Sequence, residues 1–232
     1  MTRVALCLLA GLIVGCGATS VAPTVSAEAL RQRAAERRSE GKSAEAENLL
    51  GQAIRAQPTQ TRDQRSAAAD LRRELASLRV AGDDLVGAEK LYREALTLLE
   101  TAPRGADAAI INLRTQLAGL CYRQSRFDEA ADFYRTVLAL EVTLLGETHP
   151  DPLGTMSILG GLELKRTKFA EAETLFRRQL RGVQQVHGAE KRETASVLDN
   201  LADVLEKAGR AAEATRLRGE AARIRRKLCD EC

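Results

Sequence analysis

Five alanines recur at a constant interval of 42 residues along the chain. The column consists of Ala46, Ala88, Ala130, Ala172 and Ala214. Other residues recur at the same interval. Large apolar residues follow each alanine by three or four positions, and a leucine followed by a small residue precedes most of them. These pairs are Leu75-Ala76, Leu117-Ala118, Leu159-Gly160 and Leu201-Ala202, with Arg33-Ala34 as a weaker first copy. A fixed period of this size indicates an array of equivalent supersecondary units.

Each unit contains two stretches with apolar residues at helical spacing, separated by a short polar turn. The turns recur at Gly41-Lys42, Gly82-Asp83-Asp84, Ser125-Arg126, Thr167-Lys168 and Gly209-Arg210. A glycine in such a turn supplies the left-handed conformation that ends a helix, and other residues make this cap less favourable. Since one helix pair cannot bury its whole apolar face, successive pairs must stack. We therefore predict an all-α solenoid of about five antiparallel helix pairs, in units 27–62, 63–105, 106–151, 152–192 and 193–228.

The units resemble tetratricopeptide repeats of the 42-residue kinesin light chain type. The residues that carry this resemblance are Leu117-Ala118, Phe127, Ala130, Tyr134 and the connector LGETHPDP that ends at Pro152. The resemblance covers residues 27–228 and implies a right-handed superhelix in which the first helix of each pair lines a concave groove for peptides or proteins. The chain departs from the family pattern at Arg33, Cys121, Ser125, Gln179 and Arg218. The first and last units are therefore either irregular or polar caps, which solenoid ends require.

The N-terminal residues have the pattern of a targeting segment. Arg3 precedes an apolar run from Val4 to Val14, which is shorter than the roughly 20 residues of a transmembrane helix. The run closes in Ile13-Val14-Gly15-Cys16, which resembles the lipobox of bacterial lipoproteins. That resemblance implies a signal peptide over 1–15, lipidation of Cys16 and a flexible tether over 16–26. Gly17 after the cysteine then favours the outer membrane, on its periplasmic face.

Two other interpretations of this segment stay open. Val25-Ser26-Ala27 suits ordinary signal peptidase, which would release a soluble secreted or periplasmic protein. An uncleaved membrane anchor is the third interpretation.

Composition and motifs argue against nucleic-acid binding and catalysis. The chain has 35 basic and 32 acidic residues and only 3% aromatic residues, so a basic face with stacking aromatics is not expected. His149 and His187 have no acid or cysteine at a spacing typical of metal binding or nucleophilic catalysis. Acidic residues at the start of second helices suit the helix dipole. We expect no enzyme activity, no cofactor, no metal and no small-molecule substrate.

The cysteines have separate interpretations. Cys121 lies on an apolar helical stripe and is expected in the core. Cys229 and Cys232 form a C-x-x-C pattern in the tail 229–232, which can close a disulfide. The alternatives are an intermolecular or metal link, and thiol catalysis.

First-helix positions also repeat at the 42-residue interval, and they predict a partner-binding groove. Arg123, Lys165 and Lys207 form a basic row. Polar neighbours on the same helices are Asn112, Gln116, Tyr122, Arg166 and Asn200. Such a row can hold an acidic peptide or a terminal carboxylate through charge-assisted hydrogen bonds. The alternative is that these cations only satisfy the carbonyl ends of their helices.

These observations predict a non-catalytic interaction scaffold, anchored by lipid in the bacterial cell envelope, with protein or peptide partners. The alternatives are an accessory binding module for cell-wall enzymes or substrates, and a thiol redox factor that uses the terminal cysteines. The residues do not identify the partner, because groove residues vary without changing the fold.

Overall fold

The computed structural model describes residues 25–101 and 107–230, and these ranges contain ten α-helices. The helices form five consecutive pairs: α1 (Ala27–Ser39) with α2 (Ser43–Ala56), α3 (Arg62–Ala81) with α4 (Leu85–Glu100), α5 (Asp107–Arg123) with α6 (Phe127–Leu145), α7 (Pro150–Lys165) with α8 (Phe169–His187), and α9 (Arg192–Lys207) with α10 (Ala211–Asp230). The predicted signal peptide, Cys16 and Cys232 lie outside the described residues.

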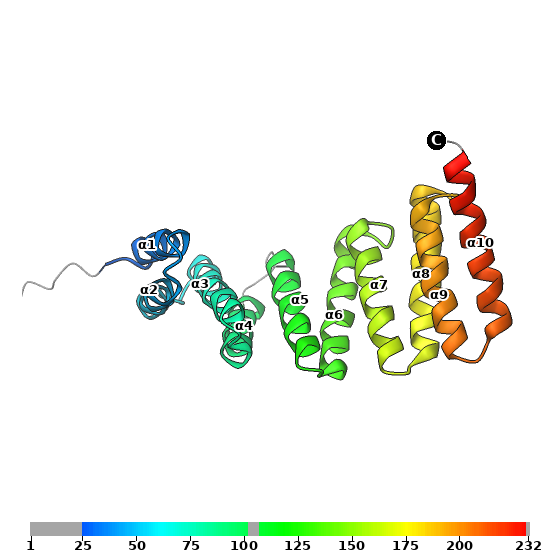
Figure 1. Ribbon diagram of the computed structural model, residues 1–232. Coiled ribbons are helices and arrows are strands. Elements are labelled where there is room, and N and C mark those ends of the chain that lie inside the picture. The colour runs from blue at the N-terminus through cyan, green and yellow to red at the C-terminus, as the bar shows by residue number, and fades with distance from the viewer. Residues whose placement is uncertain (1–24, 102–106, 231–232) are drawn as a thin grey trace, which may run out of the picture.

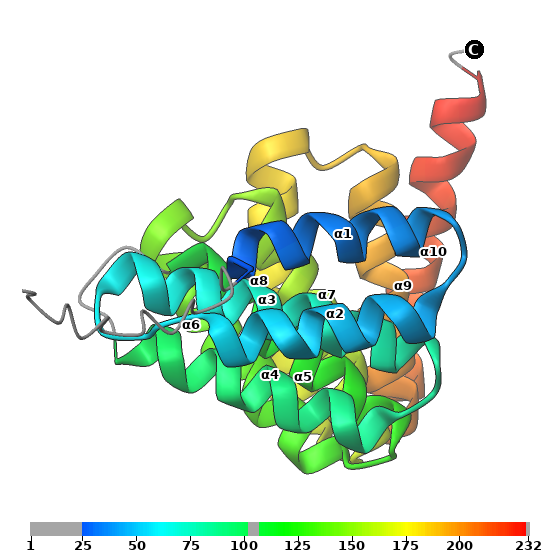
Figure 2. The same cartoon turned by 90° about the vertical axis from the view of Figure 1, so that its left-hand side faces the viewer.

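The pairs stack in one row, with α1 and α10 at opposite ends (Figure 1). Figure 2 looks along this row, with the first pair in front of the later ones. Each helix contacts chiefly the helices that precede and follow it in the chain. This pattern of neighbour contacts confirms the predicted all-α superhelical repeat fold.

The alanine column lies in the packed interior of the repeats. All five of its alanines are buried, at 0% or 1% relative exposure. On the first helix of each pair, the small residue that follows the repeated leucine also allows close packing. In the fourth unit this residue is Gly160, and a Cβ atom there would lie 2.8 Å from Cζ of Phe176. Alanine and glycine therefore allow the two helices of a pair to approach closely.

The turn inside each pair contains one left-handed residue, and these five residues also lie 42 apart. They are Gly41, Asp83, Ser125, Thr167 and Gly209, with φ between +59° and +81°. In the second unit, Gly82 keeps a negative φ and Asp83 adopts the left-handed conformation instead. The next residue closes the turn by donating its backbone N–H to a carbonyl five residues earlier, as Arg126 does to Cys121 at 2.8 Å. Each first helix therefore ends in the same hydrogen-bonded motif.

Side-chain caps fix the start of several helices. Ser26 accepts the amide of Ala29 at the start of α1, and Thr61 and Gln64 form a reciprocal capping box at α3. His149 accepts the Asp151 amide at 3.2 Å, with Pro150 as the first residue of α7. This histidine is therefore a capping residue.

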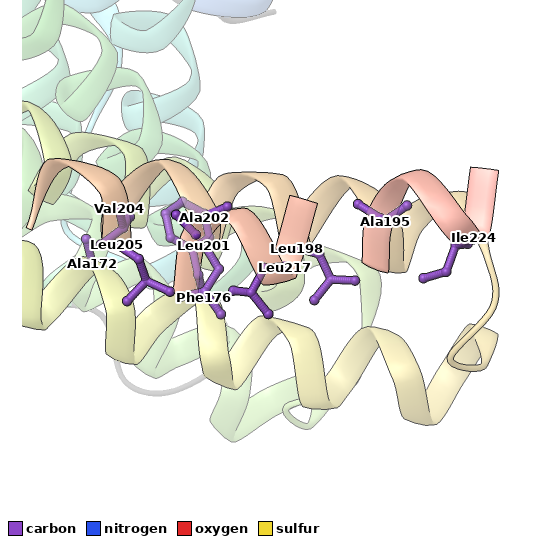
Figure 3. Packing of buried hydrophobic residues seen from close by; sticks show 12 residues of the cluster. Ala172, Phe176, Ala195, Leu198, Leu201, Ala202, Val204, Leu205, Leu217 and Ile224 are labelled. Atoms are coloured by element: carbon purple, nitrogen blue, oxygen red, sulfur yellow. The ribbon is translucent and has the colours of Figure 1, made fainter. Parts of the chain in front are cut away.

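The core consists of four hydrophobic clusters, and each one extends over more than one unit. In the last cluster, Phe176 of α8 meets Leu201 of α9 and Leu217 of α10 (Figure 3). Cys121 is fully buried in the cluster formed mainly by the third and fourth units, as its position on an apolar stripe predicts. Within the described ranges, no helix combines the length and the apolar character that a membrane span needs.

Two departures from the family pattern have polar partners. Gln179 is buried, and its Nε2 donates to the carbonyl of Leu153 at 3.0 Å. Arg218 stands where earlier units have Tyr134 and Phe176, and it forms ion pairs with Asp203 and Glu206 of α9. The last unit is therefore a regular helix pair, in which one core aromatic is replaced by a charged residue that binds its own unit.

Candidate partner-binding face

One stripe of each of α5, α7 and α9 is turned away from the packed core, and we name the three stripes together the first-helix face. Its residues are Asn112, Gln116, Gly119 and Arg123 on α5, Gly154, Ile158, Gly161 and Lys165 on α7, and Ser196, Asn200, Asp203 and Lys207 on α9. All are exposed or partly exposed. Because an α-helix turns about 100° per residue, the stripe on α7 lies opposite the buried Leu159 and Glu163.

Glycines at the centre of the first-helix face leave the helix backbone uncovered by side chains. A Cβ atom added at Gly119, Gly154 or Gly161 would meet no heavy atom within 4 Å. Ile158 lies between the two glycines of α7 and is 50% exposed. The backbone of a bound segment could therefore approach these helices closely and contact Ile158.

The basic row lies at the C-terminal ends of these helices, and two of its cations contact the preceding unit. Arg123 donates to Asp83 with an Nη2–Oδ1 distance of 2.9 Å. The Lys165 ammonium lies 5.3 Å from the ring centroids of both Tyr122 and Phe127. Lys207 is exposed, and no ion pair of its side chain occurs within the described ranges. The first two side chains are thus held in place at the edge of the face.

Two of the eight predicted groove residues lie beside the stripe. Tyr122 is 43% exposed and packs against Phe127 edge to face, with ring centroids 5.5 Å apart. Arg166 is the residue that ends α7, and its side chain is largely buried in ion pairs with Asp128 and Glu163. The structure therefore brings Asn112, Gln116, Arg123, Lys165, Asn200 and Lys207 onto one face and directs Arg166 into a contact between units.

An arginine at the start of two second helices joins neighbouring units, and we did not predict this contact. Arg126 donates to Glu89 of the preceding unit and to Glu129 of its own helix. Arg210 does the same with Glu173 and Glu213, each two 42-residue intervals further on. The signal was present in the sequence, because all three residues recur together after two repeat intervals.

Glu163 is a buried carboxylate on α7 with two arginine partners. Its side chain is 2% exposed and pairs with Arg135 of α6 and Arg166. The equivalent residues of the neighbouring units are Cys121 and Leu205, both buried. Of these three units, only the fourth therefore has a carboxylate at this buried position, and both of its oxygens form ion pairs.

Glu89, Cys121 and Glu129 bring three potential metal-ligand atoms within 4.8 Å of one another. The guanidinium of Arg126 donates to both carboxylates and already supplies a positive charge there. Burial raises the pKa of the Cys121 thiol, which disfavours the thiolate that zinc binding needs. The charge of Arg126 thus accounts for this cluster.

The C-terminal cysteine pair is described only in part. Cys229 is exposed on α10, and its predicted partner Cys232 lies outside the described residues.

Two family models match the chain, and both describe the tetratricopeptide repeat. One matches residues 111–151 and the other residues 151–227, which together make up just over half of the chain. The chain is a tetratricopeptide-repeat protein. The matched residues begin within α5, and the structure shows that α1 to α4 continue the same repeat.

Solved structures of other proteins show the same fold. Nearly identical TPR-like repeats from Podosopora anserina, assigned to the kinesin light chains, have a TM-score of 0.68 at 19% identity, covering 87% of this chain and 95% of that one. BtubC (BKLC) from P. vanneervenii has a TM-score of 0.62 at 22% identity, covering 87% and 80%. YrrB, a TPR protein with an unusual peptide-binding site, has a TM-score of 0.57 at 14% identity, covering 86% of each chain. No curated protein sequence matches significantly.

Proposed function

We propose that this tetratricopeptide-repeat protein is a non-catalytic scaffold that binds a peptide or protein segment on its first-helix face and is held in the bacterial cell envelope by lipid on Cys16. The repeat family is generally a protein-interaction scaffold without catalytic activity. The location and the binding face are proposals from this chain's own residues.

The binding proposal rests on two features of one face: glycines with free space above them, and cations that contacts with the preceding unit hold in position. Gly119, Gly154 and Gly161 leave room for a bound backbone beside the exposed Ile158. Arg123 and Lys165 are held by the preceding unit, so less side-chain entropy is lost when an acidic group binds them. An acidic segment with an apolar residue therefore suits this face.

The test replaces Arg123, Lys165 and Lys207 together with glutamine and measures partners recovered with the full-length protein from envelope membranes, by mass spectrometry. The matched control replaces Arg55, Lys90 and Lys191, three exposed cations on other surfaces, in the same way. We expect partner recovery to fall only for the first set. Equal recovery with both variants would refute binding through the basic row.

The anchoring proposal has its own test. Replacing Cys16 with serine should abolish incorporation of radiolabelled fatty acid and move the protein from the membrane fraction to the soluble fraction. The Cys7→Ser variant is the control, because Cys7 lies within the predicted signal peptide. A protein that stays soluble and unlabelled with Cys16 intact would favour secretion instead.

A further inference from the structure

Three grooves lie between successive second helices, on the side opposite the first-helix face. They run between α4 and α6, between α6 and α8, and between α8 and α10, with volumes of about 330, 600 and 340 Å³. Their apolar walls occupy equivalent positions of the repeat. One wall position is Leu96, Leu138 or Leu180, and the facing one is Phe133, Leu175 or Leu217. The three grooves are therefore versions of one repeat feature.

The charge at the rim differs from groove to groove. The α4/α6 groove has Glu100, Glu129 and Asp132 against one cation, Arg114. The α6/α8 groove is balanced, with two arginines and two glutamates. The α8/α10 groove has Arg177, Arg181 and Arg216 against one acid, Glu213. The rim thus changes from acidic through neutral to basic along the row of units.

The acids beside the α8/α10 groove are already neutralised. Arg210 binds both Glu173 and Glu213, and Arg177 shares Glu173. Neither Arg181 nor Arg216 has an ion pair within the residues that the structure describes, although most arginines of the chain do. Arg181 and Arg216 therefore remain at the rim of this groove without a salt bridge among the described residues.

The repeat shows that these two arginines are not required by the packing. The equivalent residues of the α6/α8 groove are Ala139 for Arg181 and Thr174 for Arg216. A groove of the same construction thus exists in this chain without either cation. The fold does not account for the arginines, whereas recognition of an anionic ligand would.

We propose that the α8/α10 groove binds an acidic, leucine-bearing helical segment of a partner protein. Leu180 and Leu217 form apolar walls above Leu201 and Leu205 of α9, which suits the apolar face of an amphipathic helix. The guanidinium groups of the rim suit carboxylates, which they can bind through two parallel hydrogen bonds.

Nucleic acid fits this groove less well than an acidic helix. None of its eight lining residues is aromatic, so bases would find no stacking partner. A phosphate backbone would leave Leu201 and Leu205 at the floor of the groove uncovered.

The groove also lies on the opposite side of α9 from Asn200 and Lys207, because Leu201 and Leu205 point away from the first-helix face. This site is therefore independent of the first-helix face, and both could be occupied at once.

The test selects helical peptides from a display library against the full-length protein and measures affinities by fluorescence anisotropy. The groove variant combines Arg181→Ala with Arg216→Thr, which recreates the rim of the α6/α8 groove. The control variant combines Arg192→Ala with Arg226→Ala, two exposed arginines outside the groove. We expect the selected peptides to carry aspartate or glutamate beside leucine. Their affinity should fall about tenfold or more in the groove variant, as expected for lost charge-assisted hydrogen bonds, and stay unchanged in the control.

Other outcomes would overturn the proposal. The proposal fails if the selected peptides lack acidic residues. It also fails if the groove variant keeps its helical circular dichroism and binds the peptides as tightly as the wild type. If the same variant instead loses binding to phosphatidylglycerol vesicles while no acidic peptide is selected, the arginines serve a membrane surface. Concentration-dependent self-association that the variant abolishes would assign the groove to a second copy. If replacing Arg123, Lys165 and Lys207 abolishes peptide binding, the peptide occupies the first-helix face.

Discussion

Arg126 binds Glu89 across the boundary between two units, with Nη1–Oε2 and Nη2–Oε1 distances of 2.6 and 3.1 Å. The geometry is that of a bidentate arginine–carboxylate pair. It joins the residue that precedes α6 to α4, the second helix of the preceding unit. Arg210 and Glu173 repeat the contact two units further along the chain. At the intervening boundary Lys168 and the buried Ala131 occupy these positions, and Arg166 reaches Asp128 instead.

Replacing Arg126 with alanine should destabilise the protein by about 1 kcal/mol, because the partly buried Glu89 loses two charge-assisted hydrogen bonds. Urea unfolding followed by circular dichroism measures the effect. Arg55→Ala is the control, since Arg55 is exposed on α2 and should change stability by less than about 0.5 kcal/mol. If the two variants unfold at the same urea concentration, the pair contributes nothing.

The same pair predicts a pH dependence. Hydrogen bonds from Arg126 lower the pKa of the Glu89 carboxyl below its ordinary value. A carboxyl with a depressed pKa stabilises the fold above its unfolded pKa, and this contribution is lost as the pH falls through the folded pKa. The stability advantage of the wild type over Glu89→Gln should therefore be full at pH 7 and shrink in the acidic range below the ordinary glutamate pKa. An advantage that is constant with pH would assign it to packing.

The sequence predicted the fold because each structural requirement leaves a residue at a fixed place in every unit. The alanine column is buried as expected, and the left-handed turn residue recurs at the same interval even where Asp83, Ser125 or Thr167 replaces glycine. These requirements are local, or lie within one helix pair. Periodicity in the sequence is therefore enough to show them.

Contacts between units were harder to predict, because they depend on which side chain meets which. Arg166 and Arg123 both looked like groove cations in the sequence. The structure places Arg166 between Asp128 and Glu163, while Arg123 stays on the exposed face with Asp83 as its partner. The 38- and 40-residue separations of Asp128 and Asp83 from these arginines are set by how the units stack, which composition and helical period do not specify. The partner-binding role of the first-helix face remains a prediction.

Adjacent glycines on α7 give a matched test of helix packing. Gly160→Ala should destabilise the protein by about 1 to 3 kcal/mol, because the new methyl group would overlap the Phe176 ring. Gly161→Ala meets no atom within 4 Å and should stabilise the helix by up to about 1 kcal/mol. Thermal unfolding distinguishes the two. The packing explanation also requires that Phe176→Leu restores part of the stability lost in Gly160→Ala; no restoration would contradict it.

The turn in the fourth unit should be strained by its threonine. Thr167 has φ +59°, a left-handed conformation that is costly for a β-branched residue. Thr167→Gly should therefore stabilise the protein by about 1 kcal/mol, and the reverse change Gly209→Ala at the equivalent position should destabilise it by a similar amount. Denaturant midpoints measure both. A loss of stability in Thr167→Gly would mean that the hydroxyl, which donates to the Arg166 carbonyl at 2.7 Å, matters more than the backbone strain.

The buried Glu163 gives the last prediction, and the neighbouring unit supplies its control. Glu163→Ala should destabilise the protein by about 2 to 3 kcal/mol, because Arg166 keeps a largely buried guanidinium with one carboxylate partner removed. The double variant Glu163→Leu with Arg166→Ala recreates the Leu205 and Ala208 of the fifth unit, and it should recover most of this loss. Chemical denaturation of the single and double variants measures the difference. Recovery is expected because replacing both members of a buried ion pair with apolar residues costs little, whereas removing one leaves a charge uncompensated. A double variant no more stable than Glu163→Ala would show that the stability lost with Glu163 does not come from the carboxylate partner that Arg166 loses.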